Sequence, residues 1–425
     1  MNTGKKWGYL LTGAVMLLFI GLIYGWSIFR GPLGEIFTDW DKTQLTMPFT
    51  LSIIFFCVGG FVGGKLTQRF KTRVIVLLSA VFVFAGFFLL SVVLNDQDSS
   101  ASLLAIDVLY GVLVGFGVGI SYNAILSSVV PWFPGKTGLA SGILLLGFGV
   151  GALVFASVVQ MLIAAMGGGS AGLFQTFAVL GIAVAAVLVI GSFIIKKPEA
   201  APVQAGANNN AAAAGAEKKT EAAQVQTQKD YRLGETLRTP AFWIFFAWNT
   251  SVCAGGLLVI GSAAQIAETF GAIATLGLIV SVFNGLGRPI NGALFDKLGR
   301  AKALYIDNAI MLIGGLSLLA GALTGSAAFI FIGLPLIGIS YGGSPALMSA
   351  TIAKFFGPKF YPVNFASGTF CLAPAAIIGP IIAAKLQESA GGSYNTTFIM
   401  LIALAAVAII LNAVLTASAK RRGLE

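Results

Sequence analysis

Gly119-Ile120-Ser121-Tyr122 recurs as Gly338-Ile339-Ser340-Tyr341 in the second half of the chain, and this repetition decides the fold. A second pair keeps the same order, because Ala140-Ser141-Gly142 recurs as Ala366-Ser367-Gly368. Each match alone is weak evidence. Their shared order and nearly constant offset indicate an internal duplication, so we expect two structurally related halves.

The composition is that of a membrane protein. Of 425 residues, 57% are hydrophobic and only 10% are charged, and the mean hydropathy is +0.91. A soluble domain cannot bury so much apolar surface. The net charge of +10 lies in short clusters between apolar segments, which is typical of cytoplasmic loops and not of a nucleic-acid interface.

The sequence contains few residues that could bind a metal or a cofactor. There is no histidine, and Cys57, Cys253 and Cys371 fall inside apolar segments without motif spacing. We therefore expect no metal site, no cofactor and no disulfide framework. An enzyme would need a nucleophile with a base or a metal cluster, and the sequence suggests neither.

A membrane-spanning helix needs about 20 mainly apolar residues. The sequence predicts twelve of them, at 8–29, 45–66, 73–94, 101–129, 137–163, 171–195, 240–267, 271–295, 302–324, 328–353, 363–385 and 393–417. Basic residues are concentrated in alternate loops, such as Lys65–Arg73 and Lys297–Lys302, whereas Glu35–Asp41 is acidic. By the positive-inside rule both termini are expected to be cytoplasmic.

The twelve segments divide into two sets of six. Residues 1–195 form the first predicted bundle and residues 239–425 the second. The segment 196–238 between them contains the low-complexity run Pro198–Lys229, which we interpret as a flexible cytoplasmic linker. The predicted fold is therefore all-α, with twelve transmembrane helices in two pseudo-symmetric bundles.

Arg288 is the most informative single residue. It lies within the apolar stretch Thr275–Phe295, whereas nearly every other cation lies at the end of an apolar segment. A charged side chain within a lipid-embedded helix costs about 2.5–3.5 kcal/mol, so it normally faces a cavity or a partner. No acid close in sequence can neutralise it, which favours an anionic ligand. The alternative is that the side chain extends to the membrane surface.

Other polar side chains would share this site. Asn284 is four residues before Arg288 and lies on the same helix face. Pro289 predicts that the backbone opens beside the arginine. Tyr122 and Tyr341 hold equivalent places in the two halves, and Tyr24 lies in the first predicted helix. Packing alone would also explain these tyrosines.

A loop between the eighth and ninth predicted helices carries a motif, Gly292-Ala-Leu-Phe-Asp296-Lys297-Leu-Gly299-Arg300-Ala-Lys302. It resembles the signature cytoplasmic loop of the major facilitator superfamily. An acid at a helix end can bind basic residues or a helix terminus and stabilise one conformation. We therefore assign Asp296, Lys297 and Arg300 to gating. The first-half counterpart has Gln68 in place of the acid.

The Asn284–Arg288 pair, the Gly-Ile-Ser-Tyr repeat and this loop together resemble the oxalate/formate antiporter family, which is related to the monocarboxylate transporters. The resemblance covers essentially the whole chain and implies a transporter that works by alternating access. It implies that Arg288 binds the substrate carboxylate. It also implies an aromatic cage made by Tyr24, Tyr122, Phe148 and Tyr341.

One departure from the family points to the substrate. The family's oxalate transporters have a lysine in the eleventh helix, and Leu372 stands in its place here. A second carboxylate would then be desolvated without a partner. Leu145 and Cys371 are expected to line an apolar wall beside Leu372. We therefore expect a small monocarboxylate, with L-lactate as the leading choice.

The coupling mode is less clearly marked. The resemblance favours proton symport, with anion exchange of the oxalate/formate type as the alternative. Asp107 and Asp307 lie near predicted helix ends, where they could be solvated or capping residues, and Glu268 and Asp296 border helices. A channel would need rings of polar residues, which the single arginine does not provide. We expect a monomer in the cell membrane.

Overall fold

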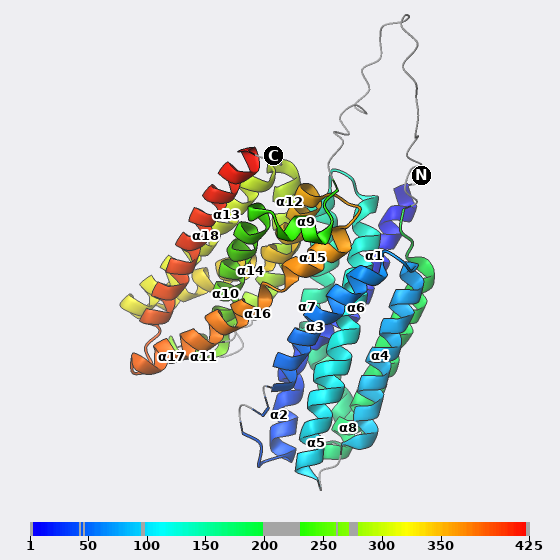
Figure 1. Ribbon diagram of the computed structural model, residues 1–425. Helices are drawn as coiled ribbons and strands as arrows, with labels where there is room; N and C mark the ends of the chain where they lie inside the picture. The colour runs from blue at the N-terminus through cyan, green and yellow to red at the C-terminus, as the bar shows by residue number, and fades with distance from the viewer. Residues whose placement is uncertain are drawn as a thin grey trace, which may run out of the picture.

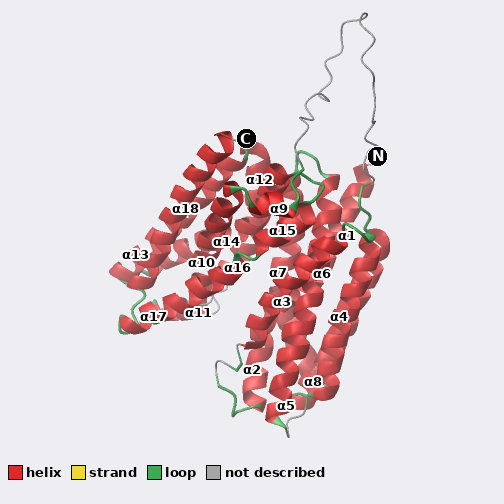
Figure 2. Ribbon diagram, viewed as in Figure 1, coloured by secondary structure: helices red, strands yellow, loops and turns green. Residues whose placement is uncertain are grey.

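The computed structural model describes residues 3–41, 44–45, 47–94, 98–198, 230–260, 262–271 and 279–421. Every regular element within these residues is helical (Figure 2). The fold is therefore all-α, as the apolar segments predict.

The first half contains eleven helical elements among the described residues. They are α1 (Thr3–Ile20), η1 (Gly21–Gly25), α2 (Trp26–Ile36), α3 (Met47–Leu66), α4 (Thr72–Val93), α5 (Ser99–Ala105), η2 (Ile106–Val114), α6 (Gly115–Val129), η3 (Val130–Trp132), α7 (Thr137–Ala165) and α8 (Gly169–Ile194). Several of these join end to end. α1, η1 and α2 form one span, and α5, η2 and α6 form another.

The second half follows the same plan. Its elements are α9 (Leu233–Leu237), α10 (Pro240–Ile260), α11 (Ala263–Thr269), α12 (Ile279–Leu298), α13 (Arg300–Thr324), α14 (Ala327–Phe356), α15 (Tyr361–Thr369), α16 (Leu372–Ala376), η5 (Ile377–Ile381), α17 (Ile382–Ser389) and α18 (Asn395–Arg421). Of the described helices, 11 are long and apolar enough to cross a membrane. α12 is not among them, because Asn284, Arg288 and Asn291 lower its hydropathy.

Among the described residues, several spans depart from a regular α-helix where the sequence predicts single helices; the fourth span, for example, contains the π-helix η2. The first span narrows to a 3-10 turn at η1, where Gly21 lies against α7; a Cβ there would be 2.2 Å from the Phe148 carbonyl oxygen. The eleventh span breaks after Thr369 and again at η5, which contains Pro380. Proline has no N–H to donate, so it interrupts the regular helix ladder. Tyr24 at the first interruption and Cys371 after Thr369 both line a cavity.

The predicted linker 196–238 lies largely outside the described residues. Its last part, from Asp230, is described and is hydrogen-bonded to the second half. The Tyr231 amide donates to the Phe356 carbonyl at 3.0 Å, and Asn364 Nδ2 donates to the Tyr231 carbonyl at 3.0 Å. Residues 230–237 therefore pack on α14 and α15, and α9 is a short helix within the predicted linker.

The two bundles lie side by side near the chain termini and diverge toward the opposite end (Figure 1). Contacts between them join α7 to α12 and α3 to α15. Asn123 Nδ2, for example, donates to the Pro362 carbonyl at 2.7 Å. At the other end α2, α5, α11 and α17 pack mainly within their own halves. The structure is therefore closed on the side of the termini.

Glycines allow the helix backbones to touch at this closed end. A Cβ on Gly138 of α7 would lie 2.3 Å from the Gly292 carbonyl oxygen of α12, and a Cβ on Gly292 would lie 2.1 Å from the Gly138 carbonyl oxygen. Both distances are far below van der Waals contact. Small residues at helix crossings let backbones approach in this way, so the closed arrangement requires glycine at both positions.

We predict that Gly292→Ala disfavours the closed arrangement. The added methyl must separate α7 from α12, and overpacking of about 1–3 kcal/mol would shift the equilibrium about fivefold or more. Spin labels at Lys65→Cys and Lys359→Cys, both exposed beside the α3–α15 contact, would report a longer distance by pulsed electron spin resonance. Gly31→Ala is the control, because nothing lies within 4 Å of its Cβ position. An unchanged distance in Gly292→Ala would contradict this account.

Candidate functional site

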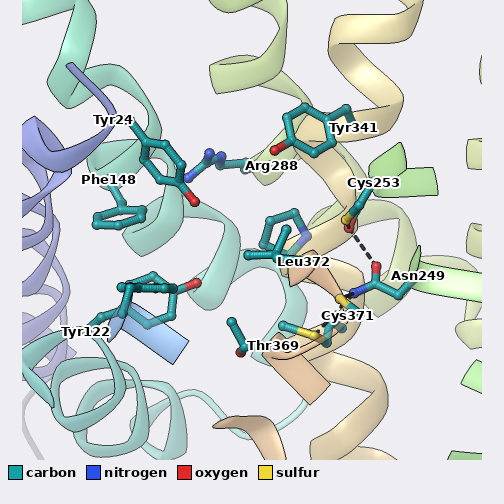
Figure 3. A pocket seen from close by; sticks show the side chains of 14 residues that line it. Tyr24, Tyr122, Phe148, Asn249, Cys253, Arg288, Tyr341, Thr369, Cys371 and Leu372 are labelled. Carbon is teal, nitrogen blue, oxygen red and sulfur yellow. Dashed lines mark hydrogen bonds between the residues drawn. The ribbon is translucent and has the colours of Figure 1, made fainter. Parts of the chain in front are cut away.

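A cavity lies between the two halves at the level of the helix interruptions (Figure 3). The first half contributes Tyr24, Phe56, Tyr122 and Phe148. The second half contributes the rest of the lining, namely Asn249, Cys253, Arg288, Tyr341, Ser344, Pro345, Met348, Thr369, Cys371 and Leu372. Seven of the nine predicted substrate-binding residues line it. Asn284 and Leu145 lie behind Arg288, as its hydrogen-bond partners.

Arg288 is the one charged side chain among the residues described around this cavity, and it is only 7% exposed. Its Nη1 donates to the Leu145 carbonyl of α7, and its Nη2 donates to Asn284 Oδ1 at 3.3 Å. Its Nε is buried without a partner. Arg288 therefore does not extend to the membrane surface, and its donors are only partly used.

Close packing positions this guanidinium. A Cβ on Gly149 would lie 2.5 Å from Arg288 Cζ, and a Cβ on Gly142 would lie 2.5 Å from the Arg288 carbonyl oxygen. The group thus lies flat against α7 in a space that only glycine leaves. The prediction that Pro289 opens the backbone is wrong, since α12 runs without a break from Ile279 to Leu298. Neighbouring helices can stabilise a proline-containing membrane helix without unwinding.

Aromatic rings form the wall that the first half presents to the cavity. The ring centroids of Tyr24 and Phe148 lie 5.1 Å apart, those of Tyr122 and Phe148 lie 4.9 Å apart, and those of Phe56 and Tyr122 lie 5.0 Å apart. Such edge and tilted contacts fix the rings relative to one another. Figure 3 shows Arg288 lying between Tyr24 of this wall and Tyr341 of the second half. The structure therefore brings the four predicted cage residues together.

The opposite wall contains a polar cluster that the sequence analysis missed. Ser344 Oγ donates to Asn249 Oδ1 at 2.6 Å, and Asn249 Nδ2 contacts Cys371 Sγ at 3.0 Å. Cys253 Sγ lies 3.1 Å from Ser344 Oγ. Asn249 lies inside the apolar segment 240–267. A polar side chain in such a segment is a candidate functional residue, as Arg288 is, so the sequence does contain a signal for this cluster.

Leu372 lines the cavity between these two walls, and Cys371 beside it is buried. Leu372 is an uncharged, branched side chain. The cavity is therefore lined by one cation, by aromatic, aliphatic and sulfur-containing side chains, and by the neutral polar side chains of Asn249, Ser344 and Thr369. An anion in it would be bound at one end and packed against apolar groups elsewhere.

The three predicted gating residues have different surroundings. Asp296 accepts hydrogen bonds from the Gly138 amide at 2.9 Å and the Leu139 amide at 2.7 Å, so it caps the start of α7 across the two halves. A carboxylate is favourable at a helix N-terminus. Lys297 is exposed. Arg300 is buried and binds Asn412 and Thr416 of α18, at 3.1 and 2.9 Å, within its own half.

The acids weighed for proton transfer also differ. Glu268 is exposed and Asp107 is partly exposed. Asp307 is fully buried in the second turn of α13, so of the readings left open by the sequence it is neither a solvated residue nor a helix cap. A predicted helix end does not show whether neighbouring helices cover it.

A family model for the major facilitator superfamily matches residues 8–380. The chain belongs to the major facilitator superfamily. It is 30% identical to the oxalate:formate antiporter of Oxalobacter formigenes over 93% of this chain and 88% of that protein. This likeness places it in the oxalate/formate antiporter branch that the sequence indicates.

More distant relatives extend this likeness. An uncharacterized transporter, YhjX of Escherichia coli, is 28% identical over 86% of each chain. The apicoplast pyruvate carrier 1 of Toxoplasma gondii is 24% identical over 68% of this chain and 58% of that protein. The proton:xylose symporter XylE shares the fold, with a TM-score of 0.70 at 15% identity over 97% of this chain and 95% of that one. The protein is therefore a multi-pass membrane transporter of the major facilitator fold and not an enzyme.

Proposed function

We propose that this protein is a secondary active transporter of small monocarboxylates, with L-lactate as the leading substrate, and that it couples their movement to protons. The observation that carries the proposal is the buried guanidinium of Arg288, which lacks a carboxylate partner among the described residues and faces the cavity. A cation in this position needs an anion, and the cavity is where an anion can reach it.

The chemistry of the site suits a carboxylate. A guanidinium is a planar fork that can donate two parallel hydrogen bonds to the two carboxylate oxygens. Arg288 Nε is unused, and its Nη2 contact with Asn284 is long at 3.3 Å. The guanidinium can turn so that these two nitrogens donate to a ligand. Asn284 can then bind a hydroxyl of a 2-hydroxy acid.

A monocarboxylate suits the rest of the cavity better than a dicarboxylate. Leu372, Phe148 and Met348 present carbon and sulfur atoms to the cavity, and its neutral polar residues, such as Asn249 and Ser344, offer no positive charge to the second carboxylate of oxalate. Desolvating an unpaired carboxylate costs several kcal/mol, whereas a methyl group is stabilised in the same place. The name of the Toxoplasma gondii relative, a pyruvate carrier, agrees with this choice.

The arrangement of the two halves supports transport by alternating access. In the closed contact Asp296 caps α7 and Gly138 touches Gly292. Breaking these contacts while the far ends approach each other would expose the cavity to the other side. In our proposal the termini are cytoplasmic, so this structure is the outward-facing state of a monomer in the cell membrane.

Anion exchange is the second candidate. It is favoured by the 30% identity to an oxalate:formate antiporter. In an exchanger the empty carrier would not reorient, because its buried cation needs an anion in both directions. The two candidates therefore differ in whether an inward proton gradient drives net uptake.

Substrate and coupling can be tested together in proteoliposomes. We expect uptake of lactate and pyruvate to exceed uptake of oxalate about tenfold or more, since one unpaired carboxylate costs at least 1.4 kcal/mol. An acidic exterior should accelerate net uptake. Acetate and formate complete the series and report the contribution of the aliphatic body. Faster uptake of oxalate than of lactate would exclude the monocarboxylate proposal, and uptake that needs an internal anion would favour exchange.

Leu372→Lys should change the preference in the opposite direction. The new ammonium would supply a partner for a second carboxylate, so oxalate uptake should rise while lactate uptake falls. Leu372→Met is the matched control, since it keeps an apolar side chain of similar size. Unchanged oxalate uptake in a folded Leu372→Lys protein would show that this position does not set the charge of the substrate.

Gly149→Ala should weaken binding by displacing the guanidinium. Its Cβ would lie 2.5 Å from Arg288 Cζ, so the side chain must leave the surface of α7. We expect KM for the transported acid to rise about tenfold or more, because misplacement by about 1 Å is costly for a charge-assisted contact. Gly8→Ala is the control, as nothing lies within 4 Å of its Cβ position. An unaltered KM would contradict the assigned position of Arg288.

A further inference from the structure

A second ionisable group lies buried in the membrane-spanning region and outside the cavity. Asp307 of α13 has no exposed surface. Its Oδ2 accepts a hydrogen bond from Ser340 Oγ of α14 at 3.2 Å, and its Oδ1 has no partner. An intramembrane acid is expensive to keep ionised, and such acids commonly have a functional role.

The surroundings of Asp307 contain no cation to neutralise it among the described residues. The Ser340 hydroxyl of α14 donates a hydrogen bond to it, and the Cys253 thiol of α10 interacts with it electrostatically; no charged group of α12 or α18 interacts with it. The cations before it on its own helix are Lys302, which is exposed, and Arg300, which binds Asn412 and Thr416 of α18. A proton is therefore the group that can neutralise Asp307 in this conformation.

Helix packing does not explain the acid. The corresponding contact in the first half, between α4 and α6, is made by Ser79 Oγ, which donates to the Gly117 carbonyl at 2.6 Å. There Ser121, the repeat counterpart of Ser340, bonds within its own helix, to the Val118 carbonyl at 3.1 Å. The same pair of helices can thus pack without a carboxylate, and the second half carries one in addition.

Asp307 also lies next to the substrate site. Its partner Ser340 precedes Tyr341, and Cys253, with which it interacts electrostatically, lines the cavity. Asn308, the next residue of α13, accepts a hydrogen bond from Trp248 Nε1 of α10 at 2.9 Å. Movements of α10 and α14 around the cavity would therefore alter the contacts of Asp307 directly.

We propose that Asp307 carries the proton that is coupled to carboxylate transport, an inference that rests on the monocarboxylate symport proposed above. On one side of the membrane its carboxylate takes a proton from water, and on the other side it returns that proton to water. No other bond forms or breaks.

Charge balance explains how this residue would enforce coupling. With substrate and proton both bound, Arg288 is paired with the carboxylate and Asp307 is neutral, so the two sites together carry no net charge. With both absent, the guanidinium and the ionised Asp307 also sum to zero. A carrier with only one of the two bound has a net charge and should reorient about a hundredfold more slowly. Symport follows, because only the fully loaded and fully empty forms cross readily.

Asp307→Asn separates exchange from net transport. The asparagine resembles the protonated acid, so the loaded carrier remains neutral while the empty carrier keeps the uncompensated charge of Arg288. In proteoliposomes of the full chain, we expect counterflow of radiolabelled lactate at equal pH to stay within about twofold of wild type. Net uptake driven by a pH gradient should fall about tenfold or more. Asp107→Asn is the matched control, since Asp107 is a partly exposed acid in a membrane-spanning helix of the other half, and it should keep both activities.

Each outcome has a defined meaning. Wild-type uptake of lactate without a response to pH would overturn the role of Asp307 and leave the monocarboxylate carrier intact. Absence of lactate transport in the wild type would overturn both. Undiminished pH-driven accumulation by Asp307→Asn would overturn the role of Asp307 alone. If Asp307→Asn does not fold, Ser340→Ala decides: loss of the hydrogen bond to the carboxyl group should shift the pH dependence of net uptake while counterflow continues, and an unshifted profile would overturn the proposal.

Discussion

An uncompensated guanidinium buried between the two helix bundles is the constraint on which the rest of this structure depends. Placing a charge there costs about 2.5–3.5 kcal/mol even before its hydrogen bonds are considered. The protein offsets this cost only in part, with one backbone carbonyl of α7 and one asparagine amide oxygen. The hydrogen-bond donors of Arg288 that remain unused, such as Nε, are available to an anion in the cavity.

The position of Arg288 also links ligand binding to the contact between the halves. Its side chain belongs to α12 but lies on the surface of α7, and α12 is the helix whose far end caps α7 through Asp296. The glycines of α7 let both contacts form along one helix pair. A change in the charge or occupancy of the cavity therefore acts on the same two helices that close the side of the termini.

The sequence predicted those parts of the structure that follow from composition and repetition. Two six-helix halves follow from the apolar segments and the duplicated tetrapeptide. Arg288 and Tyr122 could be predicted to line the cavity, because the sequence alone shows a charge, or a hydroxyl that recurs in both halves, within an apolar helix. The shorter helix interruptions, such as η1, could not be identified, since they depend on the approach of α7 to Gly21.

Other features depend on contacts between distant segments. The bonds of Asp296 to Gly138 and Leu139 join residues more than 150 positions apart in the chain. Asn249 of α10, Ser344 of α14 and Cys371, between α15 and α16, form one cluster. The sequence of one helix does not indicate which of that helix's polar residues face inward. The burial of Asp307 likewise depends on helices that cover it, so its place near a helix end was misleading.

The most direct test of the central claim is binding of lactate to purified Arg288→Gln, measured by calorimetry beside wild type and Arg288→Lys. Glutamine keeps a hydrogen-bond donor but removes the charge, so the account predicts a loss of affinity of about a hundredfold or more, with partial recovery in the lysine variant. Equal affinity of wild type and Arg288→Gln, in folded protein, would contradict it.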